Sequence, residues 1–273
     1  MGYIPLEDMF VLTTVEINPT ELCNLKCEFC PRSQGYPNLN DHMSEETIIK
    51  AFQETSAVAK KYNRIITFAI TGRGEPALSK NYKFLLTLAA EYQKDNYINV
   101  VVNTNGYKFD EFLPLHEKLH QVLFNVYDNY SDEEFEVFKQ KYRGFPSIKV
   151  FRRTVGHETS PVFYNNRAGA IKTSLTSGAN KGRCEKPLTN LFIDWNGDYN
   201  LCCNDWSKNL VLGNIHTTGI EEFYFGETIT PYKTNLFFGD RKSLHPCRGC
   251  NAKVTDAVLN LITNNPEKVF CKI

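Results

Sequence analysis

The chain has 273 residues, with 31 basic and 31 acidic side chains, and 42% of its residues are hydrophobic. This length allows one large domain, or one domain with an appendage, built on a globular core. The balanced charge gives no electrostatic argument for nucleic acid or a membrane as a partner, and we expect neither. No apolar run approaches the roughly 20 residues of a membrane span, and the N-terminus lacks the pattern of a signal peptide. We therefore expect a cytoplasmic protein whose nine cysteines are reduced and available for metal binding or catalysis.

Three cysteines follow the first strand-like run, residues 11–18. They are Cys23, Cys27 and Cys30, at the spacing Cys-x3-Cys-x2-Cys. Three thiolates on one short loop would hold three irons of a 4Fe–4S cube and leave the fourth iron open to a substrate or cofactor. A zinc site normally divides its ligands between two distant pairs, and a thioredoxin-like site would need only the last two cysteines. The spacing therefore favours an iron–sulfur cluster.

Four further strand-like runs alternate with segments that carry helix signals. The runs are residues 65–70, 97–102, 122–127 and 148–151. The helix signals are a capping Ser44, an apolar stripe over 81–92, a short pattern over 112–119 and a capping box at 131–134. This alternation predicts a parallel sheet with functional groups at the carboxyl ends of its strands. The cysteine loop, the turns at 72–76 and 103–106, and Asn125 all fall at such ends.

The cysteine loop resembles that of the radical SAM superfamily, whose pattern is Cys-x3-Cys-x-aromatic-Cys with Phe29 as the aromatic residue. The resemblance implies a partial TIM-like barrel of about six βα units, although only five strands are clear. It implies that the open iron of a 4Fe–4S cluster binds S-adenosylmethionine (SAM). It also implies a 5′-deoxyadenosyl radical that abstracts hydrogen from a substrate, chemistry that the cofactor carries and the protein orients.

The turn Gly72-Arg73-Gly74-Glu75-Pro76 has two interpretations. It can be an ordinary Gly-Pro loop after a strand. It also looks like the superfamily's GGEP turn, which implies that Gly72, Gly74 and Glu75 contact the amino group of SAM. By their positions, Asn103 and Asn125 resemble contacts to the SAM ribose or carboxylate, although polar residues at strand ends also cap loops.

The pattern becomes irregular from 155 to 181, and we expect a domain boundary there. The predicted domains are 1–165, the barrel, and 166–273, an auxiliary-cluster domain. Arg167 stands among small residues in this region. A solvated loop arginine is the simpler interpretation from sequence alone, and a guanidinium that grips a substrate is the other.

Four cysteines of the second half form two groups. Cys184 and Cys202 flank a predicted hairpin, 190–194 and 199–201, joined around Asn196-Gly197, and Cys247 and Cys250 form a Cys-x2-Cys knuckle. From chemistry alone, a structural zinc competes with an iron–sulfur cluster for these ligands. The spacing resembles the C-terminal SPASM/twitch extension of radical SAM enzymes, in its form with one auxiliary 4Fe–4S cluster. It is similar to the twitch-domain dehydrogenase type of aminoglycoside (butirosin) biosynthesis, a resemblance that makes Arg167 a candidate substrate contact or base.

The resemblance implies an α/β fold with a partial (β/α)6 barrel and a twitch subdomain of a β-hairpin plus a helix. It further implies an oxidoreductase that converts a carbohydrate-like secondary alcohol to a ketone and passes the second electron to the auxiliary cluster. A small-molecule substrate and a reducing partner such as flavodoxin or ferredoxin follow from it.

Three alternatives remain. An epimerase would use a leftover thiol, Cys203 or Cys271, to donate hydrogen, although a buried unreactive cysteine is the simpler interpretation of each. Many peptide-modifying maturases carry an N-terminal recognition domain, and only about ten residues precede the first strand here, which counts against this alternative. A non-catalytic metal-binding protein would not cleave SAM.

Overall fold

The structure, a computed structural model, describes residues 9–127, 129–153, 165–172, 182–252, 258, 260 and 270–271. Its strands are β1 (Met9–Phe10), β2 (Thr14–Ile17), β3 (Ile66–Ile70), β4 (Ile98–Thr104), β5 (Gln121–Val126), β6 (Ile148–Arg152), β7 (Asn190–Ile193), β8 (Asp198–Asn200), β9 (Val211–Asn214) and β10 (Phe270–Cys271). Its α-helices are α1 (Glu45–Lys61), α2 (Tyr82–Tyr92), α3 (Phe109–His116), α4 (Asp132–Lys141), α5 (Lys186–Thr189), α6 (Ile220–Tyr224) and α7 (Thr230–Phe237).

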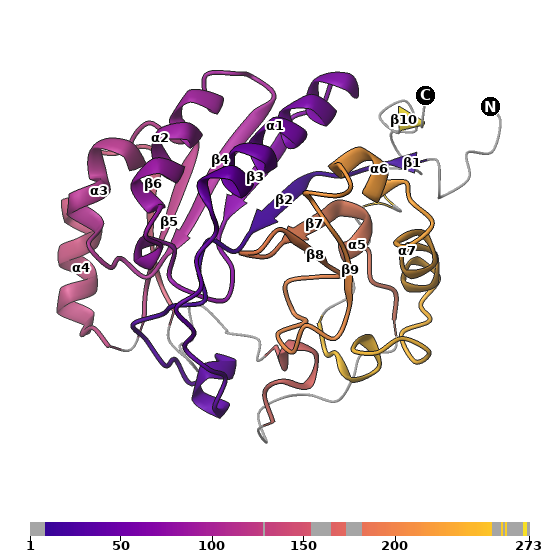
Figure 1. The fold of residues 1–273 in the computed structure, drawn as a ribbon. Coiled ribbons are helices and arrows are strands. Elements are labelled where there is room, and N and C mark those ends of the chain that lie inside the picture. The colour runs from indigo at the N-terminus through magenta and orange to yellow at the C-terminus, as the bar shows by residue number, and fades with distance from the viewer. Residues whose placement is uncertain are drawn as a thin grey trace.

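The first half of the chain alternates strand and helix, as predicted. Strands β2 to β6 are parallel neighbours in one sheet, and α1 to α4 connect them along one face (Figure 1). Local signals start the helices: the Ser44 hydroxyl accepts a hydrogen bond from the Thr47 backbone N–H, and Ser131 and Glu134 form the predicted capping box. Alternate apolar side chains of the parallel strands make the core on one face of the sheet, where Phe52 of α1 stacks on Phe68 of β3 with 3.9 Å between ring centroids.

The second half extends the same sheet instead of forming a separate one. Strand β7 pairs in parallel with β2, with Ile193 opposite Ile17, so the strand order is β6-β5-β4-β3-β2-β7-β8-β9. Among the described residues, β2 to β6 and β7 are thus the six parallel strands of the sheet. Strand β7 lies beside β2 and not beside β6. The predicted hairpin turn is present, with Gly197 at a φ of 87°. The α/β fold class is confirmed, and the pairing of β7 with β2 places Asp194 beside Asn18.

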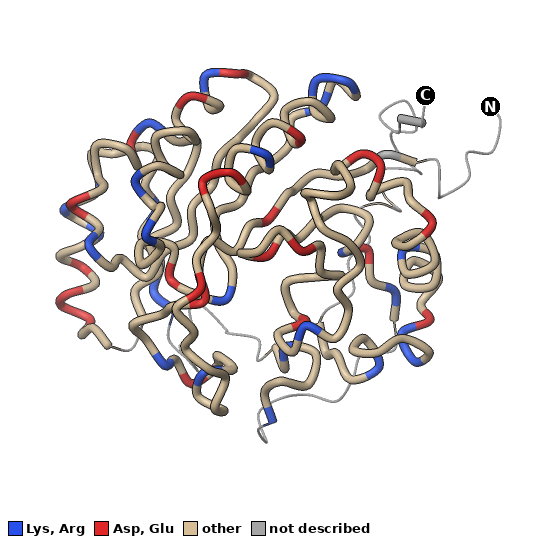
Figure 2. The backbone as a smooth tube through the Cα atoms, in the orientation of Figure 1, with Lys and Arg blue, Asp and Glu red and all other residues tan. Residues whose placement is uncertain are grey.

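The surface carries charges of both signs. Figure 2 shows acidic and basic residues interspersed along α1 to α4. None of the helices among the described residues has the length and apolar composition needed to cross a membrane.

One buried histidine gives a pH-dependent contribution to stability. His116 is 1% exposed, its Nε2 lies 2.9 Å from the Tyr82 hydroxyl, and its Nδ1 has no hydrogen-bond partner among the described residues. Burial lowers the pKa of His116 to about 4. As the pH falls, His116 is protonated in the unfolded chain before it is protonated in the folded one. Its contribution to the free energy of unfolding is therefore complete above the ordinary histidine pKa and is lost as the pH falls toward the pKa of His116 in the folded protein. Between pH of about 7.5 and about 5.5 we expect a loss of about 1 kcal/mol, measured by denaturant unfolding, that is absent in His116→Gln. An equal loss in the variant would contradict this assignment.

Candidate active site

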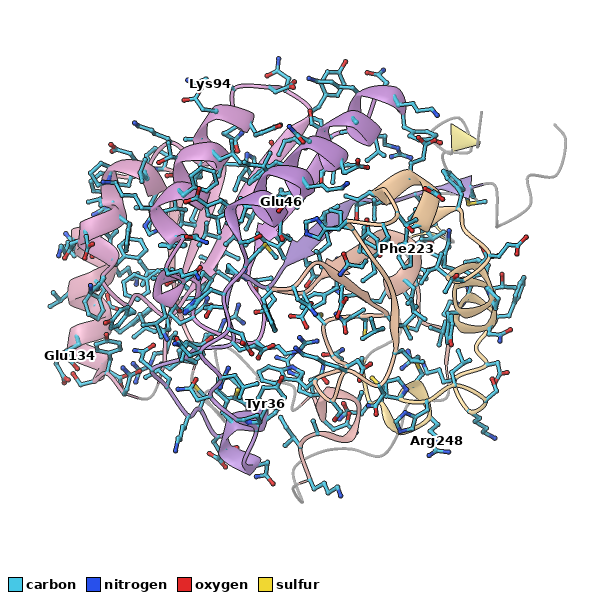
Figure 3. The ribbon with its side chains drawn as sticks, viewed as in Figure 1. Tyr36, Glu46, Lys94, Glu134, Phe223 and Arg248 are labelled. Carbon is cyan, nitrogen blue, oxygen red and sulfur yellow. The ribbon has the colours of Figure 1, made fainter. Side chains whose placement is uncertain are left out.

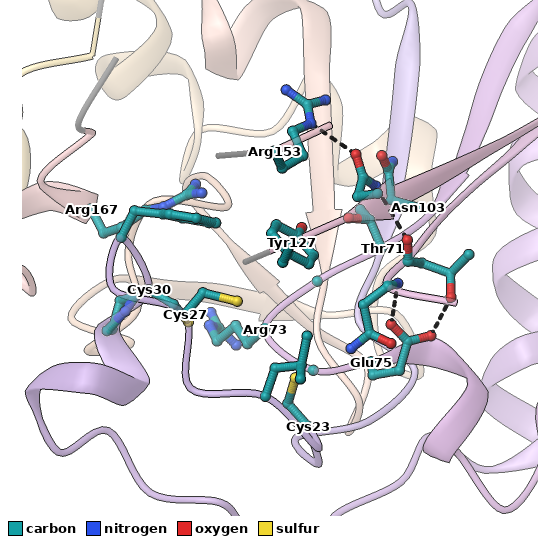
Figure 4. Close-up of a pocket in the computed structure, with 18 of the residues that line it drawn as sticks. Cys23, Cys27, Cys30, Thr71, Arg73, Glu75, Asn103, Tyr127, Arg153 and Arg167 are labelled. Carbon is teal, nitrogen blue, oxygen red and sulfur yellow. Dashed lines mark hydrogen bonds between the residues drawn. The ribbon is translucent and has the colours of Figure 1, made fainter. Parts of the chain in front are cut away.

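A cavity of about 460 Å³ lies where the loops after the parallel strands meet (Figure 4). It brings together all the residues predicted for the first site. Its walls include Cys23, Cys27, Phe29, Cys30, Thr71, Gly72, Arg73, Gly74, Glu75, Asn103, Asn105, Asn125, Tyr127, Arg153, Asn165, Arg167 and Trp206. The loop of the three cysteines forms one side, and Figure 4 shows Cys23 and Cys27 below Tyr127 in this view.

The cysteine loop is held by its own backbone and by polar neighbours. Asn38 accepts a hydrogen bond from the Cys23 N–H at 2.8 Å and donates one to the Cys23 carbonyl, while the Cys30 N–H donates to the Cys27 carbonyl at 2.9 Å. Burial raises the pKa of the Cys23 and Cys30 thiols, and the Arg32 guanidinium opposes that shift. Bound iron would supply the positive charge that a thiolate needs in such surroundings. Three thiols that lie on one loop and line one cavity therefore fit a cluster with an open iron.

The turn after β3 fastens this loop to the sheet. An added Cβ on Gly72 would come within 2.2 Å of Asn18 Oδ1, and one on Gly74 within 2.3 Å of the Thr20 carbonyl oxygen. The Glu75 N–H donates to the Leu22 carbonyl at 2.7 Å. The two glycines are therefore needed for close packing against the segment that leads into Cys23. Their predicted contact with SAM remains a prediction, and both line the cavity.

Glu75 is 3% exposed, and its carboxylate is occupied by protein donors. It accepts hydrogen bonds from the Thr104 hydroxyl at 2.6 Å and from the Asn105 N–H at 2.7 Å. Burial raises the pKa of Glu75 to about 7, against the effect of these hydrogen bonds. The Asn105 side chain in turn donates to Asn24, between the first two cysteines. The structure thus gives Glu75 a positioning contact to the cysteine loop, and its predicted contact with the SAM amino group is untested.

The other predicted cofactor contacts also line the cavity. Asn103 lies at the end of β4, and Phe29 packs against Tyr127 with 5.5 Å between ring centroids. Asn125 donates to the Leu123 and Thr104 carbonyls and accepts from Arg153 Nε at 2.8 Å, so its amide supports that arginine. Their roles toward SAM remain predictions.

Arg167 lies on a strained turn between two cavities. Its φ is 47° and that of Ala168 is 55°, in the left-handed region that non-glycine residues rarely adopt. The Asn166 amide donates to the Gly249 carbonyl at 2.6 Å, and Asn166 also exchanges backbone–side-chain bonds with Asn251. The turn is thereby attached to the cysteine knuckle of the second half. Arg167 Nη1 donates a hydrogen bond to Asn204 Oδ1 at 3.0 Å. Burial raises the pKa of the Cys30 thiol, and the positive charge of Arg167 opposes that shift.

The four cysteines predicted as ligands in the second half line one further cavity, of about 310 Å³. They are Cys184, Cys202, Cys247 and Cys250. Asn165 and Arg167 line both this cavity and the first. Arg241, 2% exposed, donates to the carbonyls of Gly182, Arg183 and Ala252 and so ties together the segments beside Cys184 and Cys250. Figure 3 shows Arg248, in the knuckle, on the same lower edge of the molecule as Tyr36 of the first cysteine segment.

Cys184, Cys202, Cys247 and Cys250 all line this one cavity, although they come from two distant parts of the chain. Four thiols gathered in this way fit the ligand set of a 4Fe–4S cluster as well as that of a structural zinc. Cys203 lines the same cavity, and burial raises its pKa to about 11.

The sequence did not predict the buried charge cluster that joins the two halves. Its members are Glu21, Arg73, Asp194 and Lys208. Arg73 Nη1 lies 2.7 Å from Asp194 Oδ2 and 3.3 Å from Glu21 Oε1, and Lys208 lies within 3.2 Å of both carboxylates. Asp194 lies 121 residues beyond Arg73, and nothing local in the sequence marks the pair. Tyr127, Arg153 and Trp206 are further cavity residues that the sequence did not indicate.

A model of the radical SAM superfamily matches residues 17–156, half of the chain, and the chain belongs to this superfamily. A second model, of an iron–sulfur cluster-binding domain (SPASM), matches residues 184–251, which span the four cysteines of the second cavity. The protein is therefore a radical SAM enzyme, and its cofactors are SAM and iron–sulfur clusters.

One curated relative is the S-adenosyl-L-methionine-dependent 2-deoxy-scyllo-inosamine dehydrogenase of Niallia circulans. It is 24% identical over 255 residues, which cover 90% of this chain and 94% of the relative. Among solved structures, BtrN in complex with AdoMet and 2-DOIA superposes with a TM-score of 0.74 at 19% identity, over 88% of this chain and 93% of BtrN. BtrN in an open conformation superposes with a TM-score of 0.63 at 18% identity, over 88% of this chain and 92% of BtrN. These structures share the fold, which agrees with the resemblance found in the sequence.

Proposed function

We propose that this enzyme oxidises a secondary alcohol of a carbohydrate-like small molecule to a ketone. The similar curated protein is, by its name, a dehydrogenase of an aminocyclitol, 2-deoxy-scyllo-inosamine. The observation that carries the proposal is that two thiol-lined cavities meet at Asn165 and Arg167. An oxidation needs both a place for the reacting carbon and a separate acceptor for an electron, and this arrangement offers both.

In this proposal, the two sets of cysteines hold two different clusters. Cys23, Cys27 and Cys30 would hold the SAM-binding cluster, and Cys184, Cys202, Cys247 and Cys250 the auxiliary one. When bound, these groups supply radical hydrogen abstraction at the first site and an electron acceptor at the second. Four thiolates leave no iron open at the second site, a ligand set that suits electron transfer more than substrate binding. We place the domain boundary between 165 and 166, at this junction, and propose flavodoxin or ferredoxin as the reductant.

Arg167 would orient the substrate. A guanidinium keeps its proton in proteins, so Arg167 would donate hydrogen bonds to a substrate oxygen and would not itself act as the base. Among the described residues of the cavity, the one carboxylate is that of Glu75, which already accepts bonds from Thr104 and Asn105. The hydroxyl proton would therefore leave to water.

The test is SAM consumption by the anaerobically reconstituted and reduced enzyme, supplied with cyclitols and sugars that carry amino, hydroxyl, carboxyl or phosphoryl groups, 2-deoxy-scyllo-inosamine among them. We expect one 5′-deoxyadenosine for each ketone formed, with deuterium transferred from the carbinol carbon. Arg167→Gln should lower the rate by about 100-fold through misplacement of the substrate, while Arg143→Gln, a change at an exposed arginine outside both cavities, should not. SAM that is regenerated in each turnover would contradict the oxidation.

The epimerase alternative would show solvent deuterium at one carbon of the recovered substrate. Cys203 lines the second cavity and is not among the described residues that line the first, which counts against its direct contact with a substrate there. The side chain of Cys271 lies outside the described part of the chain.

A further inference from the structure

Among the described residues, more basic than acidic side chains line the first cavity. The described residues that line it include three arginines, Arg73, Arg153 and Arg167, and one carboxylic acid, Glu75. Two of these four groups are already neutralised or occupied. Arg73 is paired with Asp194 and Glu21, and both oxygens of Glu75 accept hydrogen bonds from Thr104 and Asn105.

The remaining two guanidinium groups have only neutral partners among the described residues. Arg153 follows β6 and donates from Nε to Asn125 Oδ1 at 2.8 Å. Arg167 donates from Nη1 to Asn204 Oδ1 at 3.0 Å, and its buried Nε has no hydrogen-bond partner within the described part of the chain. Figure 4 shows both in the wall of the same cavity, with Tyr127 between Arg167 and the strand ends. We call Arg153 and Arg167 the arginine pair.

We propose that the substrate carries an anionic group, phosphoryl or carboxyl, that the arginine pair binds. Guanidinium groups bind such planar or tetrahedral oxyanions through paired, charge-assisted hydrogen bonds. A cationic amine would enter a cavity with two uncompensated positive charges and, among the described residues, no free carboxylate to receive it. This assignment rests on the proposed function, because it takes the ligand of this cavity to be the substrate. It distinguishes the substrate from the amine named for the curated relative.

Bound cofactors do not remove this preference. SAM has two cationic centres, the ammonium and the sulfonium, and one carboxylate, so it adds net positive charge to the cavity. A cluster held by the thiolates of Cys23, Cys27 and Cys30 carries a net negative charge that offsets the net positive charge of SAM, so the two guanidinium charges remain in excess. The SAM carboxylate could occupy one arginine, which would leave the other for the substrate. It could also be the sole ligand of both, and the experiment must separate these cases.

The experiment is isothermal titration of the reconstituted, SAM-loaded, unreduced enzyme with probes that share one sugar ring. The probes are glucose 6-phosphate, glucuronate, glucose and glucosamine. We expect at least one anionic probe to bind at least about tenfold more tightly than glucosamine, by a margin that shrinks as salt is added. The phosphate and carboxylate probes identify which anion is preferred. Arg167→Gln should abolish the difference, and exposed Arg143→Gln should retain it.

Three results would overturn the assignment. Glucosamine could bind as tightly as the anionic sugars, or no anionic probe could bind at millimolar concentration. Alternatively, Arg153→Gln and Arg167→Gln could both weaken SAM binding and leave the sugar preference unchanged, which would assign the pair to the SAM carboxylate. Since SAM cleavage to 5′-deoxyadenosine is measured separately, its absence would refute the proposed function and leave this binding result standing, whereas cleavage without an anion preference would refute only this inference.

Discussion

Replacing Arg73 with methionine is expected to lower the free energy of unfolding by about 3–5 kcal/mol. The side chains of Arg73, Glu21 and Asp194 are 1%, 0% and 1% exposed. Methionine would remove the guanidinium from two buried carboxylates and leave Lys208 as the cation nearest to both. A buried carboxylate that loses its partner pays the desolvation cost without the compensating attraction. The pKa of Asp194, which burial would raise, is held below its usual value by Arg73, in agreement with a strong coupling.

The measurement is denaturant unfolding of the reconstituted protein under anaerobic conditions. Arg143→Met, a change at an exposed arginine, is the matched control and should stay within about 0.5 kcal/mol of the unchanged protein. We also expect the Arg73 variant to lose iron from both sites, because the Arg73 side chain joins Glu21, two residues before Cys23, to Asp194 after β7 and to the Asp205 carbonyl. A decrease of less than about 1 kcal/mol in the free energy of unfolding would show that the buried charge cluster does not hold the two halves together.

Replacing Gly74 with alanine is expected to displace the cysteine loop. The added methyl group would meet the Thr20 and Leu22 carbonyl oxygens at 2.3 and 2.4 Å, and both are backbone atoms that cannot rotate away. Overpacking of this kind costs about 1–3 kcal/mol and moves the backbone. Since Leu22 precedes Cys23 directly, the first cluster should assemble poorly and SAM cleavage should fall much further than stability does.

Gly144→Ala is the matched control, because nothing lies within 4 Å of a methyl group placed there. It should match the unchanged protein in both unfolding and iron content. A Gly74→Ala variant with full iron content at the first site and undiminished SAM cleavage would contradict the packing role given to this glycine.

The sequence predicted the parts of the molecule whose signals are local. The three cysteines, the capping residues Ser44 and Ser131, and the Asn196-Gly197 turn each act within a few residues of their own position. The strands of the parallel sheet were found within a few residues of their bounds, because buried strands are continuous apolar runs. Helix α3 begins earlier than predicted, at Phe109, and contains Pro114. The predicted helix, 112–119, began only two residues before this proline.

What the sequence could not predict depends on long-range pairing. That β7 pairs with β2 follows from the whole sheet and not from residues 190–193. The buried charge cluster depends on that pairing, since it brings Asp194 beside Asn18 and Arg73. For the same reason Gly72, Gly74 and Glu75 were predicted only as cofactor contacts, whereas the structure shows that they also hold the cysteine loop in place.

The central claim is that one chain holds two iron–sulfur clusters, with Arg167 between their sites. The most direct measurement is an iron count after anaerobic reconstitution of the unchanged protein and of a Cys23→Ala, Cys27→Ala, Cys30→Ala triple variant. Two cubes predict about eight irons falling to about four in the variant. If the variant retains about four, the second cluster is independent and the proposed oxidation has its electron acceptor. If the variant retains none while the unchanged protein binds about four, the second set of cysteines holds no cluster, and the two-cluster account is contradicted.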